Sequence, residues 1–240
     1  MYSIETRQLT KKFKEKVAVD EINLQIKKWE LFALLGTNGA GKTTTIKMLS
    51  GLILPTSGDI EIENMDMKKD IFKIKEILNV SPQETAIAPN LTVKENLEFM
   101  AGVYQISNKE KKIDELIKQF KLEEILNKRT KTLSGGWQRR LSIAISLINN
   151  PKILFLDEPT LGLDVIARKE LWKVINELKG KITIILTTHY MEEAESLSDR
   201  IGIMANGKLV DVGTSEDLIK KTKTNNFEDA FVSIATGGKL

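Results

Sequence analysis

The chain has 240 residues, with 36 Lys and Arg against 33 Asp and Glu, a formal net charge of +3, one histidine and no cysteine. This length and composition are typical of one large folded domain, and so small a net charge does not by itself imply a nucleic-acid partner. The absence of cysteine excludes disulfides, thiol nucleophiles and cysteine-ligated metal sites, and a single histidine excludes multi-histidine metal sites.

The chain also lacks the signals of membrane insertion and secretion. No run without a charged residue is longer than 11 residues, whereas a bilayer-spanning helix needs about 20. Residues 1–7 contain no apolar stretch of the kind that a secretion signal requires. We therefore expect a cytoplasmic protein with no membrane span of its own.

The first predicted strands lie in residues 22–35. Ile22, Leu24 and Ile26 alternate with polar residues, a pattern that predicts a strand with one buried face. Residues 31–35 form a continuous apolar run that ends at a glycine, as expected of a strand buried on both faces of a parallel sheet.

A phosphate-binding loop follows this strand. Residues 36–43 match the pattern G-x-x-x-x-G-K-[ST], and residues 44–52 can form the helix that should come next. The glycines let backbone N–H groups surround a phosphate at the start of the helix. Lys42 is expected to reach the β- and γ-phosphates, and the Thr43 hydroxyl to bind Mg²⁺. A glycine-rich turn with an incidental lysine would not require this order of strand, loop and helix. The residues predicted to bind the nucleotide are Gly36, Thr37, Asn38, Gly39, Ala40, Gly41, Lys42, Thr43 and Thr44.

Residues from about 85 to 150 have mostly helical patterns and interrupt the strands. Capping boxes are predicted to open helices at Thr92 and at Ser107, and Ser134 is predicted to cap a third helix. We expect a single domain over residues 1–240 with this helical subdomain inserted.

Two adjacent carboxylates end the next apolar run. Residues 153–156 read as a buried strand followed by Asp157 and Glu158, and the carboxyl ends of parallel strands are where such sheets bind ligands. Asp157 is expected to hold the Mg²⁺ shell, and Glu158 to act as general base on an attacking water. A solvated turn is the alternative, but the phosphate loop favours the catalytic interpretation.

The remaining strands are predicted near the C-terminus. Residues 182–186 form a third buried run. Residues 201–204 and 208–210 flank Asn206-Gly207, a dipeptide that strongly favours a tight hairpin. Helical patterns separate the buried runs, which favours parallel strands joined by crossover helices.

With these motifs in this order, the chain resembles the ATPase subunit of ATP-binding cassette transporters over essentially its full length. Residues 133–136, Leu-Ser-Gly-Gly, resemble the family signature, and residues 161–164, Leu-Gly-Leu-Asp, resemble the D-loop. Gln83 stands at the Q-loop position, His189 at the switch position, and Phe13 where the family places an aromatic under the adenine.

The resemblance implies the fold class and a mechanism. It implies an α/β P-loop nucleoside triphosphate hydrolase with a mainly parallel central sheet, an N-terminal antiparallel β subdomain and an inserted α-helical subdomain. In the family two cassettes, identical or similar, pair head to tail and each signature caps the ATP held by its partner. The resemblance then gives roles to individual residues: Glu158 polarises water, His189 holds the γ-phosphate, Gln83 senses Mg²⁺, and Ser134, Gly135, Gly136 and Asp164 bind the nucleotide.

Three positions depart from the family pattern. Trp137 stands where Gln or a smaller residue is usual, so contacts to the partner's nucleotide are expected to change. Trp29 stands where a glycine is common, which would be costly if the backbone there has a positive φ. Thr37 replaces a common proline, a change that is expected to be harmless.

The resemblance also predicts a partner. In the family the region corresponding to residues 85–104 receives a cytoplasmic helix of an integral membrane subunit. Exposed Ile87 and Leu91 would suit such a partner, and ordinary loop packing of these two residues is the alternative. Residues 187–195 and the tail around 227–231 resemble export-type cassettes whose membrane subunit is encoded separately. We therefore expect an export ATPase on the cytoplasmic face of the cell membrane, with an importer ATPase as the alternative.

Other classes fit less well. A repair ATPase needs a long coiled coil between its nucleotide motifs, and residues 85–150 lack sustained heptads. A translation ATPase usually carries two cassettes, and this chain has one phosphate loop. A P-loop kinase would not explain residues 133–136 or His189. No nucleic-acid partner is expected.

Overall fold

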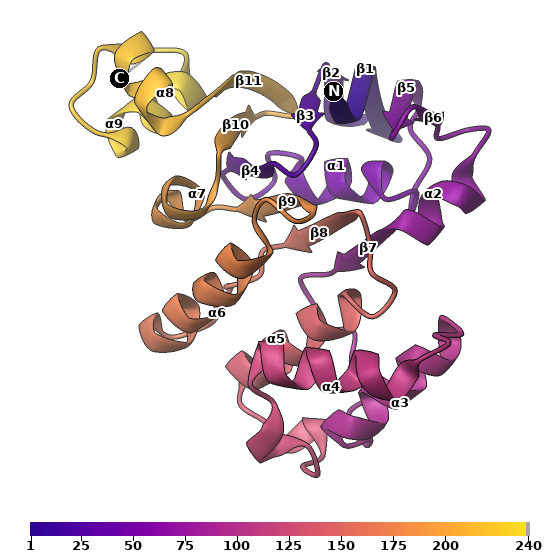
Figure 1. The fold of residues 1–240 in the computed structure, drawn as a ribbon. Coiled ribbons are helices and arrows are strands. Elements are labelled where there is room, and N and C mark those ends of the chain that lie inside the picture. Colours follow the sequence, from indigo (N-terminus) through magenta and orange to yellow (C-terminus); the bar gives the residue numbers. More distant parts are fainter. Residues whose placement is uncertain (239–240) are drawn as a thin grey trace.

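The computed structural model describes residues 1–238, and a six-stranded central sheet organises the fold (Figure 1). The strand order is β11-β10-β4-β9-β8-β7; the neighbours from β10 to β7 are parallel, and β11 is antiparallel to β10. The strands β4, β8 and β9 are buried along their whole length, as their continuous apolar runs predicted. The mainly parallel sheet is therefore confirmed. The strand bounds are β4 (Leu31–Gly36), β7 (Leu78–Ser81), β8 (Ile153–Asp157), β9 (Thr183–Thr188), β10 (Arg200–Ala205) and β11 (Lys208–Gly213).

The second sheet is antiparallel and is built mainly from the N-terminal residues. The strand predicted across Ile22–Ile26 is divided, because β2 ends at Ile22 and β3 begins at Gln25. The Thr6 hydroxyl bridges the break by donating to the Ile22 carbonyl and accepting from the Leu24 N–H, each at 2.9 Å. The predicted apolar face is nevertheless buried. The strands are β1 (Tyr2–Phe13), β2 (Lys16–Ile22), β3 (Gln25–Lys27), β5 (Ser57–Ile62) and β6 (Met65–Asp66).

Helices cover both faces of the central sheet. Helix α1 lies between the two sheets (Figure 1), where Ile46 packs with Phe32 of β4 and Ile4 of β1. Helix α6 packs on the opposite face, where its Leu171 joins Leu154 of β8. Among residues 1–238, no helix has the length and apolar character needed to cross a membrane. The bounds of the helices outside residues 85–150 are α1 (Lys42–Leu49), α2 (Ile71–Ile77), α6 (Val165–Leu178), α7 (Met191–Leu197), α8 (Ser215–Thr222) and α9 (Phe227–Thr236).

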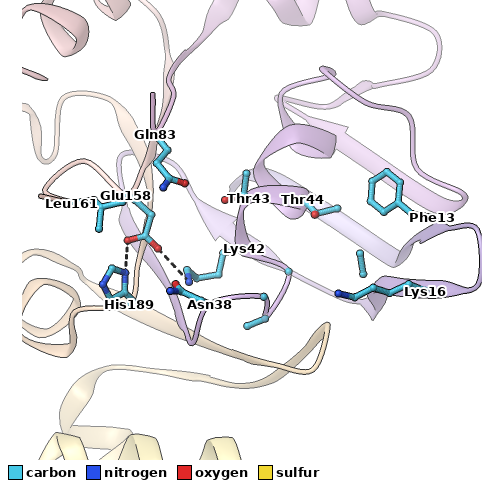
Figure 2. Close-up of a pocket in the computed structure, with 14 residues that line it drawn as sticks. Phe13, Lys16, Asn38, Lys42, Thr43, Thr44, Gln83, Glu158, Leu161 and His189 are labelled. Atoms are coloured by element: carbon cyan, nitrogen blue, oxygen red, sulfur yellow. Dashed lines mark hydrogen bonds and ion pairs between the residues drawn. The ribbon is translucent and has the colours of Figure 1, made fainter. Parts of the chain in front are cut away.

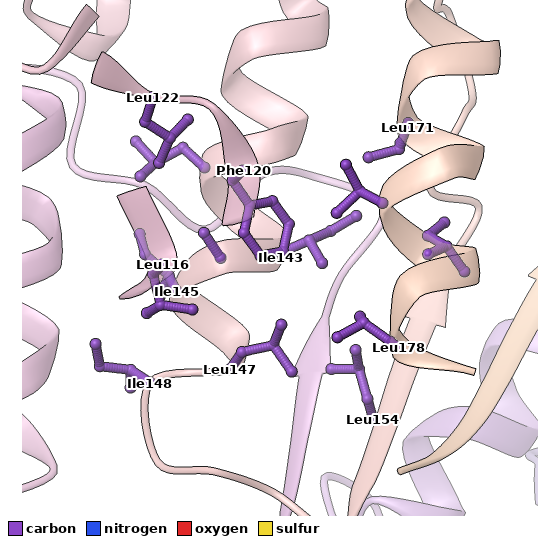
Figure 3. Packing of buried hydrophobic residues seen from close by; sticks show 14 of the residues in the cluster. Leu116, Phe120, Leu122, Ile143, Ile145, Leu147, Ile148, Leu154, Leu171 and Leu178 are labelled. Carbon is purple, nitrogen blue, oxygen red and sulfur yellow. The ribbon is translucent and has the colours of Figure 1, made fainter. Parts of the chain in front are cut away.

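The segment between β7 and β8 is helical, as predicted. The capping box at Thr92 is present, whereas the one at Ser107 is wrong, because α4 begins after Asn108 and has no side-chain cap. Ser134 occupies the N-cap position of α5, but its side chain makes no capping bond. Figure 3 shows Phe120 of α4 and Ile143 of α5 in the core that joins these helices to β8 and α6. The elements are α3 (Val93–Val103), α4 (Lys109–Phe120), η1 (Glu123–Ile125), η2 (Thr130–Thr132) and α5 (Gly135–Ser146).

The predicted hairpin joins β10 to β11 and reaches the phosphate loop. Asn206 and Gly207 have φ values of 50° and 80°, as a tight hairpin turn requires. The Gly207 N–H donates to the Ala40 carbonyl at 3.1 Å, and the Gly207 carbonyl accepts from the Asp20 N–H at 2.8 Å. The hairpin tip therefore connects the phosphate loop to the N-terminal sheet.

Trp29 has the backbone conformation that makes a non-glycine residue costly. Its φ is 61°, in the left-handed region, where an L-residue loses about 1–2 kcal/mol. The Trp29 N–H donates to Thr183 Oγ1 at 2.9 Å, which holds the turn, while the indole is 63% exposed. The position therefore favours glycine, and the exposed indole offsets little of the strain.

Candidate functional site

The phosphate loop leaves the carboxyl end of β4 and enters α1. The Lys42 side chain is buried inside the loop, where Nζ donates to the carbonyls of Gly36 at 2.7 Å and Thr37 at 3.3 Å. Gly39 and Gly41 have φ values of 81° and 105°, which only glycine adopts freely. The loop therefore has the shape that the motif predicted, with a cation at its centre.

Gly41 and Gly39 provide a matched test of this loop. A Cβ on Gly41 would lie 2.5 Å from the Ala18 carbonyl oxygen, whereas a Cβ on Gly39 would meet nothing within 4 Å. Both substitutions to alanine carry backbone strain of about 1–2 kcal/mol, and overpacking adds about 1–3 kcal/mol at Gly41 alone. We expect Gly41→Ala to lower the free energy of unfolding, measured in urea, clearly more than Gly39→Ala does. Equal losses would contradict a close approach of β2 to the loop.

Asp157 joins three elements at the end of β8. Its Oδ1 accepts from the Thr43 hydroxyl at 3.1 Å and from the Thr187 hydroxyl at 2.5 Å. A hydroxyl and a carboxylate held side by side are hard oxygen donors, which Mg²⁺ prefers, and Mg²⁺ commonly takes few protein ligands together with phosphate oxygens. Thr43 and Asp157 thus fit the predicted metal. Gln83 is exposed and lines the neighbouring cavity.

Glu158 lies between two nitrogen-bearing side chains. Its Oε1 is 3.2 Å from Lys42 Nζ, and its Oε2 is 2.7 Å from His189 Nδ1 (Figure 2). Because the carboxylate can only accept, Nδ1 of His189 donates this bond. The backbone of Glu158 is left-handed, with φ 48°, and its N–H donates to the Thr187 carbonyl at 3.1 Å and hydroxyl at 3.0 Å. Both carboxylate oxygens of Glu158 therefore have a partner, and the backbone N–H of Glu158 is held by Thr187.

A cavity of about 520 Å³ collects most of the predicted residues. Phe13 stands at one end, 49% exposed, and Glu158 and His189 stand at the other (Figure 2). Gly36, Thr37 and Asp157 do not line the cavity, although Asp157 accepts a hydrogen bond from Thr43, which does. The predicted residues that line the cavity are Phe13, Asn38, Gly39, Ala40, Gly41, Lys42, Thr43, Thr44, Gln83, Glu158 and His189.

The signature and Asp164 are not part of this cavity. Asp164 instead caps α6, with Oδ1 accepting from the N–H groups of Ile166 and Ala167 at 2.9 Å each. A Cβ on Gly136 would lie 3.2 Å from Ala167 Cβ, so this glycine lets α5 approach α6. Ser134 and Gly135 open α5 and do not line the cavity. Within one chain these four predicted residues are therefore separate from the phosphate loop.

The Trp137 side chain packs against residues of its own chain. The Arg140 guanidinium lies 4.8 Å from the centre of the Trp137 ring, and Arg140 also forms an ion pair with Glu170 of α6. The partly buried indole packs against the helical core. This departure from the family pattern thus has a packing partner within the chain.

Four residues around the site were not predicted individually as site residues. Lys16 and Ala18 of β2 and Leu161 line the cavity, and Thr187 holds both Asp157 and the backbone of Glu158. Leu161 lies in the segment that resembles the D-loop, and Thr187 lies two residues before His189, so nearness to a motif could have indicated both. Lys16 and Ala18 belong to no motif.

Glu193 is a buried acid on α7 behind the switch histidine. It is 0% exposed, its Oε1 accepts from Trp172 Nε1–H at 3.0 Å, and its Oε2 has no hydrogen-bond partner within residues 1–238. Burial raises the pKa of the Glu193 carboxyl. Glu193 does not line the cavity, and its bond to Trp172 joins α7 to α6.

A phosphate loop between a strand and a helix, facing a carboxylate pair on a strand of the same parallel sheet, defines a P-loop nucleoside triphosphate hydrolase. The sequence profile of the ABC transporter family matches residues 19–161. The chain belongs to this family, as one of its ATP-binding cassettes.

Individual relatives agree with this assignment. The chain is 41% identical over 239 residues to the probable multidrug ABC transporter ATP-binding protein YbhF of Escherichia coli (strain K12), covering 96% of this chain and 41% of YbhF. It therefore spans less than half the length of that relative. A solved ATP-binding subunit of an ABC transporter superposes with a TM-score of 0.86 and 28% identity, over 96% of this chain and 98% of that one. The cassette MJ0796, described as a dimer in a post-hydrolysis state bound to ADP and Pi, superposes with a TM-score of 0.79 and 28% identity, over 88% and 98%.

Proposed function

We propose that this chain is the ATP-hydrolysing subunit of an ABC transporter that exports its substrate through a partner membrane protein. Residues 1–240 would form one nucleotide-binding domain, with the helical subdomain inserted at about 85–150. The observation that carries the proposal is the position of Glu158, held between Lys42 and His189 and beside the Thr43–Asp157 pair. This arrangement brings together a lysine that can bind phosphate, a carboxylate that can act as base, and oxygen atoms that can bind a metal. All of them lie at one end of a cavity whose other end is lined by Phe13.

Each side chain then has a role in hydrolysis. Lys42 exchanges the carbonyls of Gly36 and Thr37 for phosphate oxygens, and the surrounding backbone N–H groups orient the phosphates. Glu158 takes a proton from the attacking water at a carboxylate oxygen, while the bond from His189 Nδ1 fixes the direction of that carboxylate. Mg²⁺, when bound by Thr43 and Asp157 with Gln83 nearby, supplies charge that stabilises the phosphates. Phe13 offers a flat apolar surface for the adenine ring.

The separation of the signature from the cavity supports a head-to-tail pair. Ser134 and Gly135 start a helix whose N–H groups can bind an anion, but this chain's own phosphate loop is elsewhere. In a two-fold pair each signature can face the partner's loop, and both sites are then equivalent. The dimeric cassette MJ0796 has the same fold. The pair would contain two copies of this chain, or one copy with a similar cassette.

An exposed apolar surface on α2 and α3 supports a membrane partner. Of the two interpretations of Ile87 and Leu91, loop packing is the one that the structure supports, because both are half-buried and Ile87 packs against the helical core. The exposed apolar side chains lie instead on α2 and α3, which both stand at the right-hand side of Figure 1, α2 beside the sheets and α3 in the helical subdomain. We propose that this surface binds a cytoplasmic helix of an integral membrane subunit, which would place the chain on the cytoplasmic face of the membrane. The exposed residues of α2 and α3 are Phe72, Phe99, Val103 and, at the end of α3, Tyr104.

Export is favoured over the alternatives. YbhF is described as the ATP-binding protein of a probable multidrug ABC transporter, and from that description we infer export for this chain. Helices α3, α4 and α5 have 11, 12 and 12 residues, far shorter than the coiled coil that a DNA repair ATPase would need. An importer ATPase remains the second candidate within the family.

The test combines hydrolysis with membrane association. Purified chain is expected to hydrolyse ATP only when Mg²⁺ is present, and tagged chain in its source cells to retain one polytopic membrane protein. Phe72→Glu is expected to lose that protein without losing ATP binding, because a charge replaces an exposed apolar contact. Trp29→Glu is the matched control, because it alters an exposed aromatic that lies outside α2 and α3, just before β4. This variant should retain the membrane protein. Retention of ribosomes or nucleic acid in place of a membrane protein would contradict the transport function.

A further inference from the structure

Arg139 of helix α5 is a buried arginine whose guanidinium donates, among the described residues, to backbone carbonyls and not to a carboxylate. It is 5% exposed, and its Nη1 donates to the Pro82 carbonyl at 2.6 Å while its Nη2 donates to the Gln83 carbonyl. Burial lowers the pKa of its guanidinium, and within residues 1–238 it forms no ion pair. Burying a charge without a paired charge is costly, so these two bonds are the specific contacts that hold the group in place.

A second contact on the same face of α5 reinforces this attachment. Ser142 lies three residues after Arg139, and its hydroxyl is 3.1 Å from the Ser81 hydroxyl. Residues three apart share a helix face, so α5 contacts the consecutive residues 81–83. Ser81 is the last residue of β7, an edge strand that, in the part of the chain that the structure describes, pairs only with β8. Helix α5 therefore fixes the point at which the chain leaves the sheet toward Gln83.

The signature lies at the N-terminal end of α5, one turn before Arg139. Gly135 is the first residue of the helix, and Ser134 precedes it. A twelve-residue helix moves as a rigid rod over this distance, because its backbone bonds link each turn to the next. A displacement of the signature is therefore transmitted to Arg139 and to the Gln83 backbone.

We propose that Arg139 is a positioning residue that couples the two nucleotide sites of a cassette pair, by tying the backbone of Gln83 to the helix that carries the signature. The proposal rests on the proposed function, in which the signature contacts the partner's nucleotide and Gln83 faces the chain's own site. ATP held by the partner would draw α5 inward, and Arg139 would bring Gln83 toward the Thr43–Asp157 pair. The nucleotide site of one chain then reaches its hydrolytic arrangement only when the signature of the same chain has bound the ATP held by the partner.

The chemistry of arginine suits this role. Its planar fork places two N–H donors on neighbouring carbonyls, whereas a lysine ammonium reaches them only as a point charge. Arg139→Lys keeps the charge but removes the two-point hold. The adjacent Arg140 supplies the matched control, because it binds Glu170 and the Trp137 ring and, within residues 1–238, its side chain forms no hydrogen bond with residues 81–83.

The absence of cysteine allows a direct test. A spin label on Glu84→Cys, an exposed position next to Gln83, reports the mobility of this segment without competing thiols. Glu158→Gln is included so that ATP is not consumed. The label is expected to lose mobility when ATP and Mg²⁺ are added to chains with native Arg139 or with Arg140→Lys. In Arg139→Lys it should remain as mobile as without ATP.

Hydrolysis by unlabelled chains with native Glu158 gives the second readout. Arg139→Lys is expected to raise the Mg²⁺ concentration for half-maximal rate at least fivefold and to lower kcat about tenfold, with the Kd for ATP changed less than twofold. Arg140→Lys should change none of these values. If Arg139→Lys does not fold, Arg139→Gln, which keeps one donor group and removes the buried charge, is measured in its place.

The outcomes separate this inference from the function on which it rests. Equal loss of label mobility and equal Mg²⁺ dependence in native and Arg139-substituted chains overturn the coupling role and leave the ATPase assignment intact. If instead the chain with native Arg139 binds no ATP, the proposed function fails and this proposal fails with it.

Discussion

Glu158→Gln is expected to lower the rate of ATP hydrolysis by at least about 100-fold, the contribution of a positioned general base. Glutamine keeps the shape of the side chain and can still accept a bond from His189 Nδ1, but it cannot take a proton from water. ATP binding should be retained, because the Lys42 amine loses an anionic partner and becomes freer to bind phosphate. Steady-state hydrolysis and equilibrium ATP binding measure the two effects separately.

The same variant should accumulate paired cassettes. If hydrolysis reopens the pair, a chain that binds ATP without turnover stays closed, and size-exclusion chromatography with ATP and Mg²⁺ should show a dimer. Glu192→Gln, an exposed carboxylate on α7, is the control and should hydrolyse ATP at the native rate. Undiminished turnover in Glu158→Gln would contradict the role of Glu158 as base.

Lys42→Met is expected to weaken ATP binding about 10- to 100-fold, from the roughly 1.5–3 kcal/mol carried by a hydrogen bond to a charged group. The methionine side chain keeps most of the apolar stem but supplies no donor. Binding of a fluorescent ATP analogue measures the loss directly. An unchanged affinity would contradict the position of Lys42 beside the phosphates.

Removing Lys42 also affects folding, because its ion pair with Glu158 is buried. A single partner left without its counter-charge is destabilising, although His189 still contacts the carboxylate. Lys42→Met should therefore lower the free energy of unfolding, and adding Glu158→Gln should recover part of that loss without restoring ATP binding. This double-substitution cycle separates the structural contribution of the pair from its contribution to binding.

The predictions that succeeded depended on local order along the chain. The phosphate loop could be placed because a buried strand, glycines and a helix follow one another, and Asp157 and Glu158 because they end a buried strand. The sheet type followed from continuous apolar runs. In each case the residues that determine the geometry are neighbours in sequence.

The contacts that could not be predicted join distant segments. Lys16 and Ala18 reach the cavity because β2 passes beside the phosphate loop, and no pattern in β2 indicates that approach. Arg139 lies within a helix that was expected, but its carbonyl partners are at Pro82 and Gln83. The predicted capping box at Ser107 failed because the helix starts one residue later, without any side-chain cap.

The hairpin tip at Asn206–Gly207 has a consequence for engineering the protein. Tips of hairpins are usually the preferred sites for inserted tags and for new chain ends in circular permutants. Here both backbone groups of Gly207 are engaged, one with Ala40 of the phosphate loop and the other with Asp20 of β2. An insertion at this turn would loosen the nucleotide loop from the sheet that carries the aromatic end of the cavity, so fusion partners and permuted termini belong elsewhere on the surface.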